Sequence, residues 1–131
     1  MSVTPPDISA SDLDTTAQFL RSQSQLLITS HTNSDGDGIA GGLALMGLLR
    51  QLDVHGQMLL QDVPSDGYAH LDGWDAIVAV ADADKNRHGC AVILDCPSFD
   101  RIGRVGDHLR ADADLLNIDH HQDNVRFGTV N

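Results

Sequence analysis

Three short polar clusters, rich in aspartate and histidine, stand directly after apolar runs of the sequence. They are residues 31–37 (HTNSDGD), 95–98 (DCPS) and 119–121 (DHH). Carboxylate oxygens and imidazole nitrogens together suit Mn²⁺, Mg²⁺, Fe²⁺ or Zn²⁺, whereas the lack of a thiolate-rich set argues against structural zinc. The clusters therefore predict a divalent-metal site, provided that the fold brings them together.

The apolar runs before the clusters are predicted to be buried strands. They span residues 25–30 (QLLITS), 90–94 (CAVIL) and 114–118 (DLLNI), and a further strand is expected at 55–61. Helices are predicted from an N-cap at Ser11 or Asp12 to Ser22, over residues 39–52, and, with interruptions at two glycines, over 98–110. Residues 77–81 fit a strand and a helix equally well.

The alternation of strands and helices predicts a Rossmann-like α/β fold, with a mostly parallel sheet and helices on both faces. Ligands of such sheets bind at the carboxyl ends of the strands. All three clusters are therefore expected at one edge of the sheet. The shared position of the three clusters after strands is stronger evidence for a site than any single cluster, because an Asp-Gly-Asp-Gly string alone is usually a turn.

The spacing within the clusters indicates how two ions would share them. Asp35 and Asp37 are separated by one residue, so in an extended loop they turn in different directions and can serve different ions. Asp95 belongs to the second of the three clusters, directly after the strand expected at 90–94, and can bridge the two ions. A calcium loop of the EF-hand type does not fit, since its ligand spacing and closing glutamate are missing.

The composition limits the partners of the chain. The sequence has 131 residues, which suits one small domain or part of a larger one. All 19 acidic residues are aspartate, only eight residues are lysine or arginine, and the net charge is -11. This balance argues against a basic surface that grips duplex nucleic acid. An anionic substrate would need a cation such as a metal ion to offset its charge.

The remaining sequence features point to a cytoplasmic protein. Cys90 and Cys96 form no CxxC pair, which suits a reducing compartment. No apolar run approaches the ~20 residues of a membrane span, and the N-terminus lacks the pattern of a signal peptide. Residues 1–11 are expected to be a flexible lead-in to a domain at 12–131. Four histidines stand outside any motif and are expected at the surface or in local packing: His55, His70, His88 and His108.

Three stretches, HTNSDGDGIAGG, ILDCPSFDRIG and NIDHHQDN, resemble in order the first three motifs of the DHH phosphoesterase superfamily. The chain is most similar to its oligoribonuclease and 3'-phosphoadenosine 5'-phosphate phosphatase branch. The resemblance implies two ions, usually Mn²⁺ but also Mg²⁺ or another divalent metal. His31, Asp35 and Asp95 would hold one ion. Asp37, Asp95 and His120 would hold the other.

The resemblance also implies roles for five further residues. Asp119 would orient His120, and His121 would contact the substrate phosphate, so Asp119 and His121 are the catalytic candidates. The substrate-binding candidates are Asn33, Arg101 and Asn124.

The implied activity is hydrolysis of short oligoribonucleotides or nucleotide phosphates by a water that two ions activate. The implied partners are a short single-stranded RNA or a nucleotide phosphate as substrate, no membrane, and a second copy in a homodimer of the intact protein. Inorganic pyrophosphatases and single-strand exonucleases share the motifs, so both stay open as alternatives.

The superfamily has a fourth motif and a C-terminal substrate-binding domain, and neither is found before Asn131, ten residues past His121. The chain is therefore expected to be the N-terminal part of a DHH domain that could lack activity on its own. A non-catalytic module that binds a metal or a nucleotide is the remaining alternative.

Overall fold

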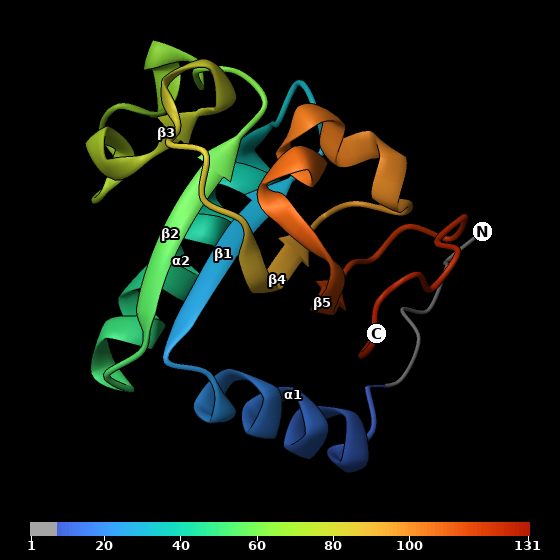
Figure 1. Cartoon of the computed structure of the whole chain (residues 1–131). Helices are drawn as coiled ribbons and strands as arrows, with labels where there is room; N and C mark the ends of the chain where they lie inside the picture. Colours follow the sequence, from blue (N-terminus) through green and yellow to red (C-terminus); the bar gives the residue numbers. More distant parts are fainter. Residues whose placement is uncertain (1–7) are drawn as a thin grey trace, which may run out of the picture.

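The apolar runs of the sequence form the strands of one parallel sheet, as the computed structural model of residues 8–131 shows (Figure 1). The strands are β1 (Gln25–Ser30), β2 (His55–Leu60), β3 (Val78–Ala79), β4 (His88–Leu94) and β5 (Leu109–Ile118). Their order is β3-β2-β1-β4-β5, and every pairing is parallel. The predicted Rossmann-like α/β class is confirmed.

Both faces of the sheet are covered, which explains why the strands are apolar without alternation. On one face, Ile28 and Val92 pack against Ile39 and Leu49 of α2 (Gly36–Gln51). The helix α1 (Ala10–Ser22) adds side chains to this cluster. On the other face, the neighbouring strand residues pack against the 3₁₀ segment η4 (Phe99–His108). Three single 3₁₀ turns lie between β2 and β4: η1 (Asp66–Tyr68), η2 (Trp74–Ala76) and η3 (Val80–Asp82).

The first helix begins earlier than its sequence indicates. Ser9 is the N-cap, and Asp12 is the third helical residue, whose carboxylate accepts a hydrogen bond from the Ser9 amide at 3.0 Å. The prediction of a cap at Ser11 or Asp12 is therefore wrong, because this reciprocal capping box fixes the start two residues upstream. The predicted lead-in at 1–11 falls partly on residues 1–7, which lie outside the described residues, and partly on this first turn.

The second helix also begins earlier, at Gly36 instead of residue 39. Asp35 is its N-cap and accepts a hydrogen bond from the Asp37 amide at 3.2 Å, so capping outweighs the low helix propensity of the glycines. Gly38 allows the helix to start close to β1, since a Cβ atom there would lie 2.8 Å from Cβ of Ser30. The loop at 31–35, between β1 and α2, is therefore short and leads directly into the helix.

The ambiguous stretch at 77–81 is divided between the two-residue strand β3 and the start of η3. The segment predicted as helical at 98–110 is a 3₁₀ segment, and Gly103 breaks it with φ 64° and ψ -139°. The strand β5 starts at Leu109, five residues before the predicted strand, although residues 110–112 are exposed. An edge strand tolerates this exposure because one of its sides faces solvent. No helix within residues 8–131 has both the length and the apolar character to cross a membrane.

Cys96 is fully buried, and its thiol is expected to react slowly. Burial raises the pKa of Cys96 to about 11, although a hydrogen bond to the Ser98 carbonyl oxygen opposes the shift. A rise of two pKa units lowers the thiolate fraction about 100-fold at neutral pH. In a Cys90→Ala background, alkylation at pH 8 should be at least about 100-fold slower in native than in guanidinium-unfolded protein. Equal labelling rates in the two states would contradict the low reactivity of Cys96.

The raised pKa of Cys96 also favours folding below pH 9, and this contribution to stability should be lost as the pH rises toward 11.

Candidate metal centre

The three polar clusters meet at one edge of the sheet because β1, β4 and β5 are neighbours that run in the same direction. His31 follows β1, Asp95 follows β4 and Asp119 follows β5. The N-terminus of α2 brings Asp35 and Asp37 to the same edge. The topology therefore places donors from distant parts of the chain around one point.

Asp95 lies at the centre of this group. Its side chain is only 9% exposed; one carboxylate oxygen lies 3.5 Å from Nε2 of His31 and the other 3.1 Å from Nε2 of His120. The backbone of Asp95 has φ 53°, a left-handed conformation that non-glycine residues seldom adopt, and its amide donates to the Ile118 carbonyl at 2.9 Å. The chain thus turns sharply at the end of β4 and holds both carboxylate oxygens between two histidines.

His31, Asp35 and Asp95 form the first donor group, with one potential ligand atom of each lying within 4.8 Å of the others. The tautomer of His31 suits ligation. Its Nδ1 lies 2.6 Å from the Thr32 carbonyl oxygen, which can only accept, so the tautomer of the neutral ring that fits this contact has the proton on Nδ1 and the lone pair on Nε2. The same Nε2 faces Asp95.

The second donor group lies on the other side of Asp95. Asp95, His120 and His121 have ligand atoms within 4.8 Å of one another. Asp37 is also near, with its carboxylate 3.8 Å from Nε2 of His120. The structure therefore brings the predicted set of Asp37, Asp95 and His120 together. It adds His121 as a nearby donor for which the sequence predicted only a substrate contact.

Asp119 contacts His121 instead of His120, the histidine that it was predicted to orient. Its carboxylate accepts a hydrogen bond from Nδ1 of His121, two residues further along the chain, at 2.5 Å. This bond raises the pKa of His121. Burial alone would raise the pKa of Asp119, but the hydrogen bonds from Asn124 and His121 outweigh it and lower that pKa. Asp119 is therefore an ionised carboxylate that fixes the His121 ring.

A network of two asparagines supports this turn. Asn124 donates to the Asp119 carboxylate at 2.6 Å and to Oδ1 of Asn117 at 2.8 Å. Asn117 is buried and donates to the carbonyl oxygens of Ile93 and Cys96, both at 3.1 Å. It thus joins the end of β5 to the turn that carries Asp95. Asn117 was not among the predicted site residues, although it is a polar residue within an apolar strand next to the DHH motif.

Replacing Asn117 with alanine should destabilise the protein by roughly 2–3 kcal/mol, because it removes the two hydrogen bonds that Asn117 donates in the interior and the one that it accepts from Asn124. Urea unfolding of the metal-free protein measures this effect. Asn86→Ala is a suitable control, since Asn86 is exposed and its one side-chain hydrogen bond within residues 8–131 is to Asp84, and it should cost less than about 1 kcal/mol. Equal losses in the two variants would contradict the supporting role of Asn117.

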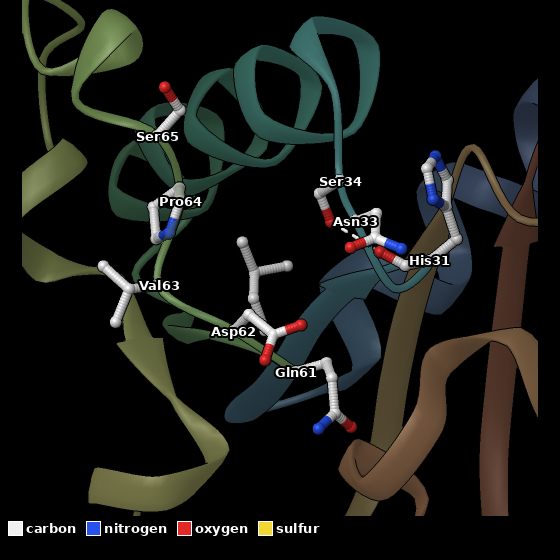
Figure 2. Close-up of a pocket in the computed structure, with 9 residues that line it drawn as sticks. His31, Asn33, Ser34, Gln61, Asp62, Val63, Pro64 and Ser65 are labelled. Atoms are coloured by element: carbon white, nitrogen blue, oxygen red, sulfur yellow. Dashed lines mark hydrogen bonds between the residues drawn. The ribbon is translucent and has the colours of Figure 1, made fainter.

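A pocket of about 260 Å³ opens beside the first donor group (Figure 2). One wall carries His31, Asn33 and Ser34, with the Ser34 hydroxyl donating to the His31 carbonyl at 2.6 Å. The opposite wall is the loop after β2, residues 61–65. Gln61 in this wall accepts a hydrogen bond from the Arg104 amide at 2.6 Å, and no sequence pattern marked it.

Of the other two predicted substrate-binding residues, Arg101 is exposed, whereas the side chain of Asn124 is engaged in hydrogen bonds within the protein. The carbonyl oxygen of Arg101 accepts from the Thr32 amide at 2.7 Å, so this segment lies beside the loop at 31–35. Asn124 uses its amide group within the protein, as described above, and its Oδ1 accepts from the Arg126 amide at 2.6 Å. Substrate contacts by Asn33, Arg101 and Asn124 remain predictions.

The donor set fits divalent ions. It consists of hard carboxylate oxygens and imidazole nitrogens, as borderline ions such as Mn²⁺ prefer. The carboxylates of Asp35, Asp37, Asp95 and Asp119 gather at one edge, and a cation placed between them would relieve their mutual repulsion. Asp95 and His31 are largely shielded from solvent, which favours a defined site over loose ion binding.

Comparison with known proteins places the chain in a family. A solved structure titled an exopolyphosphatase-related protein from Bacteroides fragilis superposes with a TM-score of 0.84 at 20% sequence identity. The match covers 97% of this chain and 39% of that protein, so the chain spans less than half of its length. The sequence pattern of the DHH family, N-terminal domain, matches residues 25–130. The chain therefore belongs to the DHH family and carries its N-terminal domain.

Proposed function

We propose that the chain is the metal-binding part of a phosphoesterase that hydrolyses short oligoribonucleotides or nucleotide phosphates, with Mn²⁺ as the preferred ion. The observation that carries the proposal is the position of Asp95, which stands between two donor groups at the carboxyl end of the sheet. Such an arrangement suits two ions that share one carboxylate. When bound, two divalent ions activate water and offset the negative charge of a phosphoryl group.

The surrounding residues support an anionic, nucleotide-like substrate. Asp119 fixes the ring of His121, so the other ring nitrogen can hydrogen-bond a phosphoryl oxygen. Arg101 offers an exposed guanidinium to a phosphate, and Asn33 offers an amide in the adjoining pocket. The NIDHH context favours the oligoribonuclease branch over pyrophosphatase and single-strand exonuclease. Two free, buried thiols within the described residues support a cytoplasmic location.

The test is hydrolysis, by the intact protein that contains this domain, of a 5'-labelled RNA trimer and of 3'-phosphoadenosine 5'-phosphate with Mn²⁺. We expect product formation that depends on Mn²⁺ and is lost in Asp95→Asn. Asp53→Asn serves as the control, because Asp53 shares the positive φ (55°) of Asp95 (53°) but lies after α2. Full activity in Asp95→Asn would overturn the proposal.

A non-catalytic metal-binding module is the second candidate, because the donor groups around Asp95 suffice to bind an ion whether or not a substrate is hydrolysed. Calorimetry separates the two candidates. Two tightly bound Mn²⁺ ions per chain support the phosphoesterase, while one weakly bound ion without hydrolysis supports the module.

A further inference from the structure

A second pocket lies at the end of the sheet opposite to the metal centre. It has a volume of about 420 Å³ and is formed where β1, β2, β4 and β5 begin. Its lining includes Gln25, His55, Gln57, Arg87, His88 and Arg110. Because the metal donors follow the other ends of these parallel strands, the pocket is separate from the metal centre.

The pocket concentrates positive charge in an acidic protein. The sequence has eight lysines and arginines against 19 aspartates, yet two arginines and two histidines line this pocket. Within residues 8–131, none of the side chains lining it is acidic. Burial lowers the pKa of His88, against an opposing effect of Asp84, so the charge comes chiefly from Arg87 and Arg110.

The guanidinium of Arg110 lies next to Gly89 of β4. A Cβ atom at Gly89 would lie 2.8 Å from Cζ of Arg110, so the missing side chain leaves room for the guanidinium to pack there. Arg110 forms an ion pair with Asp112, in which Nε of Arg110 lies 3.4 Å from a carboxylate oxygen, and both side chains are mostly exposed. Such a surface pair is weak and can be replaced by a stronger anion.

We propose that this pocket binds a phosphate group, either free phosphate or the end of a small phosphorylated molecule. Arg87 and Arg110 would pair with the phosphate oxygens, and His55 and Gln57 would donate further hydrogen bonds. The volume lies within the range of small-molecule sites. The C-termini of α1 and α2 lead into β1 and β2 at this end, and their partial negative charge opposes an anion. We therefore expect a dissociation constant of roughly 1–10 mM for inorganic phosphate.

The test is a titration of the metal-free protein, kept in EDTA, with inorganic phosphate and with AMP, followed residue by residue by amide NMR. Sodium chloride at matched ionic strength controls for screening. We expect saturable shifts at residues 87–89 and at Arg110. Tighter binding of AMP would identify a small phosphorylated molecule as the natural source, and equal affinity would identify free phosphate.

The double variant Arg87→Gln/Arg110→Gln should weaken phosphate binding at least about 10-fold. Arg104→Gln is the matched control, since Arg104 pairs with Asp107 at 3.8 Å on the surface of η4 and should leave binding unchanged. Shifts that chloride reproduces, or that persist in a folded double variant, would overturn the proposal. Because no metal is present and no activity is measured, this result is independent of the proposed phosphoesterase function.

Discussion

Asp95→Asn is expected to weaken Mn²⁺ binding at least about 100-fold while leaving the metal-free protein folded. Loss of a residue that merely supports a ligand costs 10- to 100-fold in metal affinity, and Asp95 itself faces both donor groups. Asparagine keeps the shape of the side chain and tolerates the left-handed backbone at φ 53°. The metal-free stability should therefore change by less than about 1 kcal/mol, since repulsion among the carboxylates is also relieved.

Calorimetry gives the affinity, and thermal unfolding in EDTA gives the stability. Asp53→Asn is the matched control, because Asp53 is an exposed aspartate with φ 55° outside the metal centre. It should bind Mn²⁺ as the unaltered chain does. Similar Mn²⁺ affinities for the two variants would show that Asp95 is not a ligand of the ion.

The second large effect is thermal stabilisation by the ion. At a free Mn²⁺ concentration of 100 times its dissociation constant, a single site adds about 2.7 kcal/mol to the free energy of unfolding. For a chain of 131 residues this corresponds to a rise of roughly 10 °C in Tm. The physical cause is neutralisation of the carboxylates that the fold crowds at the ends of β1, β4 and β5.

The rise in Tm should be reversed by EDTA, should not be reproduced by sodium chloride of equal ionic strength, and should be absent in Asp95→Asn. Asp53→Asn should retain it. An equal rise in Asp95→Asn would mean that Mn²⁺ binds elsewhere on the acidic surface.

The meeting of the polar clusters was predictable because parallel strands bring all their carboxyl ends to one edge. His31, Asp95 and His120 each follow such an end directly or within one residue, so strand assignment alone was enough to group them. The start of α2 was less predictable. Its glycines suggested a late start, whereas the capping bond between Asp35 and Asp37 decided it.

The finer contacts of the site depend on backbone turns that a sequence pattern does not contain. The partner of Asp119 is His121 because of the path of the chain after β5, and the role of Asn117 needs the carbonyl groups of Ile93 and Cys96 nearby. The second pocket, which Arg87 and Arg110 line, was not predicted from the sequence for a similar reason. His55 and His88 lie in no motif and were expected to be ordinary surface or packing residues, and only the sheet order brings them together with Arg110.

Paramagnetic broadening can locate the ion, which we expect at the carboxyl ends of β1, β4 and β5. Mn²⁺ added at a small fraction of the protein concentration should first broaden the amide signals of residues 31–37, 95–96 and 119–121. Signals at the strand starts, such as those of Gln25 and His88, should stay sharp. Strongest broadening in the aspartate-rich segment 66–84, or uniform broadening over the whole acidic surface, would contradict the account.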